Sequence, residues 1–424
     1  MYIKREISEE ILKSLRDFPV VLLTGARQVG KSTFTNMQLP EYEYFTLDNI
    51  NTANRIEQDP LGFIKNSQKP IVIDEIQKAP NLMNAIKMVV DENIYKLNIE
   101  NSIDRKEVYG KFLLTGSANV IQMKKLTETL AGRIVLHELM PFSQKEIRKK
   151  ENFDMDKLHN NPQDLSFDKK ISAKEIKNAI ITGGYPERVR LKDDIFNKRK
   201  WTDSYIETYI ERDARDINEI KNISAFIRLY NLLAHQSGAL VVKQNLAIDT
   251  KLSIPTVTAY TEILSQIYQI SWVSCWFPKN SNKQFIKSPK LYFTDSGILS
   301  HCLQIDTIDD IEKTSKSGNI FETFIFGELR KAINNSGHNR KDIFYTRTKD
   351  GKEVDFIIEG KDGQNPLAIE VKLSETIHSD DFKHIKFLQD EAPELDFQGI
   401  VFYTGNEVIP FGKNLTAVPA AVFF

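Results

Sequence analysis

A glycine-rich stretch near the N-terminus combines the residue types that bind a phosphate chain. Gly25 and Gly30 bracket it, Lys31 and Ser32 close it, and an apolar run at residues 20–24 precedes it. Glycines let backbone N–H groups curl around phosphate oxygens, and a helix beginning near Lys31 would add positive potential at its N-terminus. Lys31 would reach the β- and γ-phosphates, and the Ser32 hydroxyl would bind Mg²⁺. The pattern GxxxxGK(S/T) with these flanks predicts a loop that binds ATP and Mg²⁺.

Two carboxylates follow a second apolar run, at residues 71–73. Asp74 would hold the Mg²⁺ shell, and Glu75 would orient and polarise the attacking water, because in phosphoryl transfer the protein contributes mainly positioning and charge. Two acids after a strand can also simply cap a helix. Beside the glycine-rich loop the catalytic interpretation is favoured, so Lys31 and Glu75 are predicted catalytic residues.

Further nucleotide contacts are expected along the loop and after a third apolar run, at residues 112–115. Within the loop the predicted contacts are Gly25, Ala26, Arg27, Gln28, Val29, Gly30, Lys31, Ser32 and Thr33. After the third run, Ser117 or Asn119 would bond the γ-phosphate or the attacking water, and the sequence does not decide between them.

Arg133 lies between an expected helix and an expected strand at residues 134–136. An arginine at such a place can act as a finger on a neighbouring subunit's nucleotide. That interpretation makes Arg133 a catalytic residue and implies a homo-oligomer. A surface arginine at a turn is the alternative.

The middle of the chain is basic. Residues 221–290 carry eight Lys or Arg against two acids, although the whole chain balances 57 basic against 58 acidic residues. Three expected helices and a hairpin-like stretch predict a winged helix, whose third helix would present Thr256, Thr258 and Tyr260 to a DNA groove. The lysines expected to contact phosphates are Lys279, Lys283, Lys287 and Lys290. Winged helices also bind proteins, so a protein partner remains the alternative to DNA.

Carboxylates near the C-terminus predict a second metal site. Asp355 and Glu370 lie in adjacent expected strands, at residues 353–358 and 367–373, and period 2 places Lys372 on the face of Glu370. Two carboxylates would bind Mg²⁺ beside a lysine able to position or deprotonate water, which is the arrangement of PD-(D/E)xK nucleases. All three are predicted catalytic residues, and both acids are predicted metal ligands. A divalent site without cleavage and an inactive domain are the alternatives.

Two more residues belong to this C-terminal prediction. Glu322, on the preceding helix, is a further candidate acid. Arg347, on the strand before Asp355, would either touch a scissile phosphate or form a salt bridge with a carboxylate.

The order of these motifs resembles a bacterial and archaeal branch of the AAA+ ATPases that carries a C-terminal domain of unknown function. The resemblance rests on VVLLTGARQVGKST, IVIDEIQKAP, FLLTGSAN, LAGRIVLHELMPFSQKEI, GGYPERV, YIERDARDI, KLYFTDSGIL, FETFIFGELRK and AIEVKL, in that order. It implies an α/β protein with a P-loop AAA+ core at residues 1–144, a helical lid at 145–220, a winged helix at 221–295 and a restriction-endonuclease-like PD-(D/E)xK domain at 296–424. It also implies a nucleotide-sensing arginine in the lid, for which Arg188 is the nearest candidate.

Composition limits the class of protein. Hydrophobic residues make up 41% and charged residues 27%, which excludes collagen-like, mucin-like and wholly disordered chains. Two cysteines, Cys275 and Cys302, exclude a disulfide framework and a four-cysteine zinc site. No apolar run approaches the length that spans a bilayer, and the N-terminus lacks a signal-peptide pattern. We therefore expect a cytoplasmic protein without a membrane partner.

These features together predict a Mg²⁺-dependent ATPase of the AAA+ superfamily. Its ATP binding and hydrolysis would be coupled to a C-terminal half that binds DNA through residues 221–290, with DNA cleavage left undecided. The alternative is a nucleotide-gated switch that binds a protein partner and carries a catalytically inactive nuclease-like domain.

Overall fold

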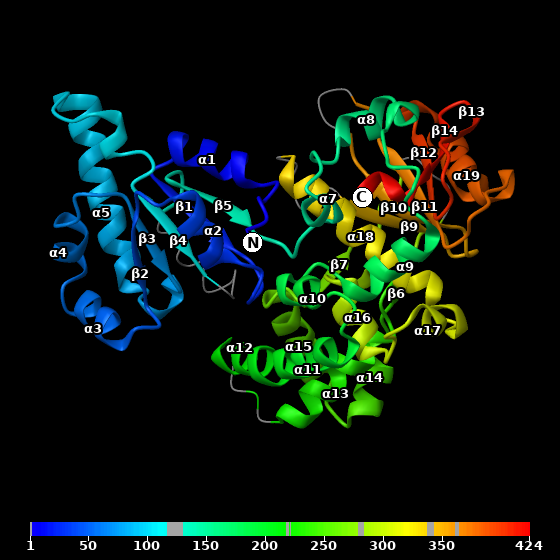
Figure 1. Ribbon diagram of the computed structural model, residues 1–424, viewed down its shortest axis with the longest axis horizontal. Coiled ribbons are helices and arrows are strands. Elements are labelled where there is room, and N and C mark those ends of the chain that lie inside the picture. The colour runs from blue at the N-terminus through cyan, green and yellow to red at the C-terminus, as the bar shows by residue number, and fades with distance from the viewer. Residues whose placement is uncertain are drawn as a thin grey trace. The chain divides into compact units, whose positions relative to one another are not determined.

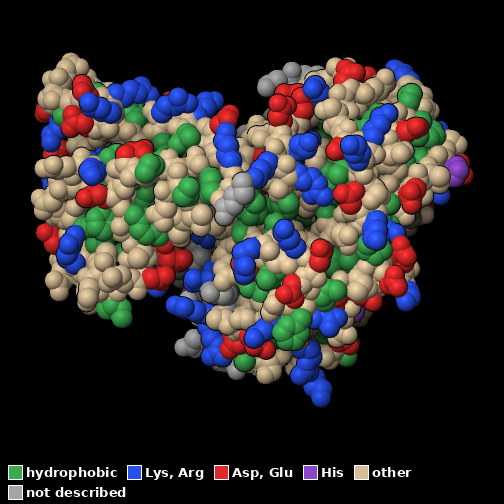
Figure 2. All heavy atoms as spheres, in the orientation of Figure 1, with side chains coloured by type: hydrophobic (Ala, Val, Ile, Leu, Met, Phe, Trp, Pro, Cys, Tyr) green, Lys and Arg blue, Asp and Glu red, His purple; other side chains and the backbone are tan. Residues whose placement is uncertain are grey.

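The chain forms two compact units in the computed structural model, which describes residues 2–116, 130–217, 220, 222–278, 284–336, 343–360 and 364–424 (Figure 1). The N-terminal unit comprises residues 4–140 with 266–268, and the C-terminal unit comprises residues 1–3, 141–265 and 269–424. Basic and acidic side chains are interspersed over the face drawn in Figure 2, in line with their near-equal numbers. None of the helices in the described ranges has the length and apolar content that crossing a membrane requires.

A parallel sheet forms the centre of the N-terminal unit, with the order β2-β3-β4-β1-β5. Its strands are β1 (Val20–Thr24), β2 (Glu43–Thr46), β3 (Ile71–Asp74), β4 (Phe112–Thr115) and β5 (Ile134–Glu138). The three central strands, β3, β4 and β1, are buried along their whole length, which is why the sequence shows them as continuous apolar runs. The expected α/β class with a parallel sheet is confirmed.

Helices cover this sheet. They are α1 (Ser8–Asp17), α2 (Lys31–Gln38), α3 (Ile50–Gln58), α4 (Pro60–Lys65) and α5 (Asn81–Tyr95). Alternate residues of β1, Val20 and Leu22, share a hydrophobic cluster with Ile86 and Val90 of α5, so α5 packs along one face (Figure 1).

The C-terminal unit begins with helices, as the loss of β-signal after residue 143 predicts. They are α7 (Gln144–Arg148), α8 (Met155–Asn160), α9 (Ala173–Thr182), α10 (Pro186–Leu191), α11 (Ile195–Tyr205) and α12 (Glu211–Ile217). Two of them start at capping boxes that the sequence carries: Ser143 with Glu146 at α7, and Ser172 with Glu175 at α9.

Three helices and a small antiparallel sheet follow. The helices are α13 (Ile223–Ala234), α14 (Lys243–Thr250) and α15 (Ile254–Gln266), and the strands are β6 (Ala239–Leu240), β7 (Ile270–Val273) and β8 (Lys290–Phe293), with β8 in the centre. The connection between β7 and β8 also pairs with the next sheet, through bridges from Cys275 to Tyr345 and from Phe285 to Thr348. The segment expected to form a wing is therefore attached to the C-terminal sheet.

The last part of the chain builds a six-stranded mixed sheet in the order β13-β14-β12-β11-β10-β9. The strands are β9 (Ile343–Arg347), β10 (Glu353–Ile358), β11 (Leu367–Lys372), β12 (Gln398–Tyr403), β13 (Ile409–Gly412) and β14 (Leu415–Pro419). The helices of this part are α16 (Ser296–Cys302), α17 (Ile308–Lys313), α18 (Ser317–Asn335) and α19 (Lys383–Glu391).

Aromatic packing joins the two sheets of the C-terminal unit through α18. The Tyr292 ring on β8 stacks on Phe326 of α18 at a centroid distance of 4.5 Å and lies 5.5 Å from Phe356 of β10. On α19, Ile385 and Leu388 pack in the cluster that contains Val401 of β12. Residues from β8, α18 and β10 thus share one core, and that core positions the acidic residues described below.

Gly184 is a point of close backbone approach within the C-terminal unit. Its carbonyl accepts from the Phe142 N–H at 2.7 Å, and its own N–H donates to Asp295 at 2.8 Å. A Cβ at this position would lie 2.2 Å from the Phe142 carbonyl oxygen, so any side chain must push the two backbones apart.

We predict that Gly184→Ala destabilises the C-terminal unit by about 1–3 kcal/mol, the usual cost of overpacking a closed contact. The measurement is the melting temperature followed by circular dichroism. Gly318→Ala is the matched control, because a Cβ at Gly318 meets nothing within 4 Å and alanine favours the helix there. Equal melting temperatures for Gly184→Ala and the unchanged protein would contradict the prediction.

Candidate functional site

The glycine-rich loop leaves β1 and enters α2 with the backbone that only glycine adopts easily. Gly25 has φ +141° and Gly30, which precedes the first residue of α2, has φ +98°. A Cβ on Gly25 would lie 2.2 Å from the Leu139 carbonyl oxygen. The loop is therefore held tightly at its first glycine and opens onto the N-terminus of α2, where backbone N–H groups are available to an anion.

Lys31 points back into this loop. Its ammonium group donates to the carbonyl oxygens of Gly25 at 2.8 Å and Ala26 at 2.9 Å, and the residue is only 7% exposed. A phosphate chain in the loop would therefore meet a lysine already placed there.

Asp74 is the point at which four elements of the N-terminal unit converge. The Ser32 hydroxyl lies 3.4 Å from its Oδ2 atom, the Tyr44 hydroxyl donates to the same oxygen at 2.5 Å, and the Thr115 hydroxyl donates to Oδ1. Burial, followed by the hydrogen bond to Asp74, raises the pKa of Tyr44 above its usual value, so Tyr44 stays a neutral donor. A hydroxyl and a carboxylate at this separation are the oxygen donors that suit Mg²⁺, and the residues present fit that ion.

The sequence indicated Ser32 and Asp74 but not Tyr44 or Thr115. Both missed residues are at or near the C-terminal ends of strands that flank or pair with β3, and β3 itself ends at Asp74. The sequence did not identify them, because which strands lie beside β3 depends on the strand order, and only the structure gives that order.

Glu75 has an unusual backbone for a residue with a side chain, with φ +60°. Its carboxylate lies 3.8 Å from the Arg27 guanidinium and accepts a hydrogen bond from Gln77. Strained backbone of this kind often accompanies functional residues. The structure thus brings Glu75 and Arg27, two residues of the predicted site, into contact.

Three further residues were predicted for the nucleotide site: Arg133, Ser117 and Asn119. Arg133 forms an ion pair with Asp91 of α5 and donates to the Ala131 carbonyl oxygen at 3.0 Å. Ser117 and Asn119 lie outside the described residues, so the choice between them stays open. The finger role of Arg133 stays a prediction.

In the C-terminal unit, a β-bulge places Asp355. The register of β10 against β9 shifts between Val354 and Ile357, and bulges commonly redirect a side chain beside a functional site. The Asp355 carboxylate accepts from the Val371 N–H at 2.9 Å. On β11, Lys372 donates to Glu370 at 2.9 Å.

Several buried charges surround Asp355. Burial raises its pKa well above the usual range, and the nearby charges of Glu322 and Glu370 raise it further, while Lys290 and Lys372 oppose them. The structure therefore brings together Glu322, Asp355, Glu370 and Lys372, the four residues that the sequence analysis proposed for this centre.

Lys290 is the unexpected member of the centre. Its ammonium lies 3.0 Å from Glu322, 3.9 Å from Asp355 and in contact with Glu353, and its side chain is 2% exposed. The prediction that Lys290 contacts DNA phosphates is wrong, because a side chain buried among acids cannot reach a phosphate chain. No three His, Cys, Asp or Glu side chains of the described ranges are arranged to hold a metal ion, so the acids here do not fit Mg²⁺ in this conformation.

Three further predictions can be judged from the C-terminal unit. Tyr260 was expected at a DNA groove, but it is buried with its ring edge on Phe226 at 5.2 Å. Arg188, the candidate nucleotide sensor, is buried and donates to the carbonyl oxygens of Ile181 and Thr182, and its sensing role stays a prediction. For Arg347, which was expected to touch a phosphate or to form a salt bridge, the structure shows the salt bridge.

That salt bridge joins Arg347 to Glu353 at 2.9 Å. Lys279 and Lys283 lie outside the described residues, whereas Lys287 is exposed. Of the four lysines assigned to the wing, Lys287 is thus the one that the described residues show at the surface.

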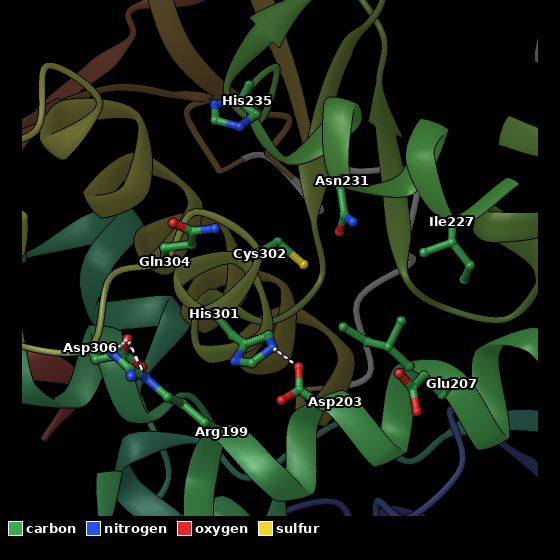
Figure 3. Close-up of a pocket in the computed structure, with 11 residues that line it drawn as sticks. Arg199, Asp203, Glu207, Ile227, Asn231, His235, His301, Cys302, Gln304 and Asp306 are labelled. Carbon is green, nitrogen blue, oxygen red and sulfur yellow. Dashed lines mark hydrogen bonds and ion pairs between the residues drawn. The ribbon is translucent and has the colours of Figure 1, made fainter. Parts of the chain in front are cut away.

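A polar cavity of about 620 Å³ also lies within the C-terminal unit (Figure 3). The His301 imidazole is hydrogen-bonded to Asp203 at 2.8 Å, and Arg199 forms an ion pair with Asp306, so these polar groups are paired with one another. Burial raises the pKa of Cys302 to about 12, so its thiol is a poor nucleophile. Cys275 and Cys302 are both free thiols, as expected. No predicted catalytic residue lines this cavity.

Comparison with protein families supports the nucleotide site. Residues 17–148 match an AAA domain, residues 173–309 match a domain of unknown function (DUF8612), and residues 317–423 match a second domain of unknown function (DUF4143). The N-terminal unit therefore contains a P-loop domain of the AAA type, which confirms this part of the prediction. The winged-helix and PD-(D/E)xK assignments stay predictions.

Similar sequences occur in bacteria and archaea. The chain is 26% identical over 421 residues to the uncharacterized protein Rv2008c of Mycobacterium tuberculosis, covering 98% of this chain and 83% of the relative. It is 25% identical over 365 residues to the uncharacterized protein MJ1544 of Methanocaldococcus jannaschii, covering 84% and 75%.

Two solved structures show weak similarity. The Walker-type ATPase PABY2304 of Pyrococcus abyssi aligns with a TM-score of 0.42 at 16% identity, over 71% of this chain and 96% of that chain. The ORC2 protein of Aeropyrum pernix aligns with a TM-score of 0.31 at 10% identity, over 63% and 85%. The assignment rests on the AAA domain match and not on these scores.

We predict that Thr115→Val weakens Mg²⁺ binding at the nucleotide site, because Asp74 loses the hydroxyl that orients it. Removing such a partner typically costs about 10–100-fold in metal affinity. The measurement is the Mg²⁺ concentration that gives half-maximal binding of a fluorescent ATP analogue.

Thr46→Val is the matched control for this prediction. Thr46 pairs with Asp74 in strand register, but its hydroxyl accepts from the Asp48 N–H. A Thr115→Val variant with the Mg²⁺ dependence of the Thr46→Val variant would show that Asp74 does not need Thr115.

Proposed function

We propose that the protein is a Mg²⁺-dependent ATPase whose nucleotide cycle controls a nucleic-acid-binding C-terminal half. The observation that carries the ATPase part is the meeting of Lys31, Ser32 and Asp74 at one edge of a parallel sheet, in a domain that matches the AAA family. Phosphate-binding backbone, a buried lysine and a hydroxyl–carboxylate pair are together the parts that phosphoryl transfer needs.

In this proposal Ser32 and Asp74 hold the metal ion, and the ion supplies charge neutralisation for the phosphates. Lys31 would exchange the carbonyl oxygens of Gly25 and Ala26 for phosphate oxygens, since a charged acceptor is the stronger partner. Tyr44 would keep the Asp74 carboxylate in place through its hydrogen bond.

Glu75 would accept the proton of the attacking water. Its contact with Arg27 at 3.8 Å suggests how ATP itself enables this step. A phosphate that attracts Arg27 would weaken its contact with Glu75, whose carboxylate could then bond the water. Arg27 and Glu75 would thus link phosphate binding to water activation.

The nucleic-acid part of the proposal is supported by the order of elements in the C-terminal unit. Residues 223–293 run helix, strand, helix, helix, strand, strand, which is the order of a winged helix. Residues 317–403 run helix, three strands, helix, strand, which is the order of the PD-(D/E)xK nuclease core. Exposed Arg228, Lys251 and Lys287 are cations available to phosphates.

A protein partner is the second candidate, and one observation favours it. Three apolar side chains on or beside α14 and α15 are exposed: Val242 at 47%, Ile248 at 75% and Ile254 at 44%. A surface that reads DNA carries polar and basic groups, whereas apolar residues are typical of the core of a protein interface.

Lys31→Ala should abolish ATP hydrolysis, because the phosphates lose their buried cation. We expect at least a 100-fold fall in the rate of phosphate release, about 2.7 kcal/mol of transition-state stabilisation. Lys69→Ala, at an exposed lysine of the same unit, should leave the rate unchanged. Hydrolysis at the normal rate by Lys31→Ala would remove the basis of the ATPase assignment.

DNA binding should be measured by fluorescence anisotropy across a salt titration. Phosphate contacts predict an affinity that falls steeply with salt, and the double variant Lys251→Ala/Lys287→Ala should reduce the slope of log affinity against log salt by about 2. No binding at low salt, together with loss of a co-purifying protein in Ile248→Ser, would favour the protein-partner alternative.

A further inference from the structure

The acidic centre of the C-terminal unit is assembled around a lysine from a different sheet. Lys290 is the first residue of β8, yet its ammonium lies among Glu322 of α18 and Glu353 and Asp355 of β10. The Tyr292 hydroxyl donates to the same Glu322 oxygen at 2.5 Å. Three carboxylates thus surround one ammonium group, whose side chain is 2% exposed.

The other cations of the centre are already engaged. Lys372 donates to Glu370 at 2.9 Å, and Arg347 pairs with Glu353 at 2.9 Å. Lys290 is therefore the cation in direct contact with Glu322 and closest to balancing Asp355. Buried carboxylates without a cation are costly, so removing this ammonium leaves acids that must take up either protons or another cation.

We propose that Lys290 is a built-in cation that occupies the place of a divalent metal ion between Glu322 and Asp355, and that its withdrawal opens this centre to Mg²⁺ or Mn²⁺. The proposal rests on the PD-(D/E)xK-like part of the proposed function and is independent of the ATPase site. Carboxylate oxygens are the ligands these ions prefer, and Asp355, which lies at the register shift in β10, is 3.9 Å from the Lys290 ammonium.

For Lys290 to withdraw, the connection between β7 and β8 would have to detach from the C-terminal sheet. The Ile286 N–H donates to the Arg347 carbonyl oxygen at 2.9 Å, and the Lys349 N–H donates to the Gln284 carbonyl oxygen at 2.8 Å. The Tyr345 hydroxyl donates to the carbonyl oxygen of Ser288, two residues before Lys290. Release of residues 284–289 from β9 would free the chain that carries Lys290, so a ligand that binds this segment would control access to the centre.

The test is Mn²⁺ binding by the full chain without nucleotide or DNA, using Lys290→Met, which keeps side-chain bulk and removes the charge. We expect Lys290→Met to bind one more equivalent of Mn²⁺ than the unchanged protein, counted by electron paramagnetic resonance. Saturating Mn²⁺ should also raise its melting temperature by roughly 5 °C, while the unchanged protein shifts by less than about 1 °C. The double variant Lys290→Met/Asp355→Asn should lose both gains.

Lys331→Met is the matched control. Lys331 is also a buried lysine, paired with Glu328 at 2.7 Å and bonded to the Phe142 carbonyl oxygen at 3.0 Å. Its loss should lower stability without creating Mn²⁺ binding, which separates a metal site from general destabilisation.

Two results would overturn the proposal. One is a folded Lys290→Met variant that binds no more Mn²⁺ than the Lys331→Met control. The other is Mn²⁺ binding by the unchanged protein that Asp355→Asn removes, which would show that Lys290 does not keep the ion out; this second measurement decides the matter even if Lys290→Met does not fold. Mn²⁺ binding by Lys290→Met without DNA cleavage would uphold the role of Lys290 and reject a nuclease activity of this centre.

Discussion

The parallel register of β1, β3 and β4 is the constraint on which the nucleotide site depends. Leu23 pairs with Thr115, and Ile73 pairs with Leu114, so the three strands end at the same edge of the sheet. This register brings the loop residue Ser32 and Thr115 to Asp74, while Tyr44 comes from β2, which pairs with β3 on its other side. The glycine-rich loop leaves the end of β1, Thr115 closes β4, and Asp74 itself closes β3. A sheet with the same residues in another strand order would separate them.

A second constraint acts in the C-terminal unit, where charge is buried and must be balanced. The chain as a whole carries a formal charge of −1, but this sum does not describe how charges are paired. By sequence Lys290 belongs to the basic segment at residues 221–290, but in the structure it pairs with Glu322 and Glu353. Buried charges of this kind fix which elements must pack together, because an unpaired partner is costly. The pairing therefore attaches β8 to α18 and β10.

The sequence predicted the local elements well where apolar runs are long and bounded by polar residues. The run at residues 112–115 and the strands at 343–347 and 353–358 have the predicted limits. It did not predict β13 and β14, which are short and lie near Pro410 and Pro419, residues that weaken a strand pattern.

The sequence identified the site residues that stand in short motifs and missed those whose contacts depend on strand order or tertiary packing. Lys31, Ser32 and Asp74 stand in motifs with fixed spacing. Tyr44 and Thr115 depend on strand order, which the sequence did not reveal. Lys290 depends on tertiary packing, because its partners Glu322 and Asp355 are 32 and 65 positions away. A basic count over a segment cannot tell an exposed lysine from a buried one, which is why Lys290 was assigned to a DNA surface.

The chain joins a P-loop AAA-type domain to a C-terminal unit whose acidic centre is closed by its own lysine. We propose that the site around Asp74 hydrolyses ATP and that this turnover is linked to the C-terminal unit. The measurement that tests this proposal is the initial rate of phosphate release from Mg²⁺·ATP by the full chain, with and without DNA. We predict release that rises when DNA is added. No release under either condition would contradict the proposal.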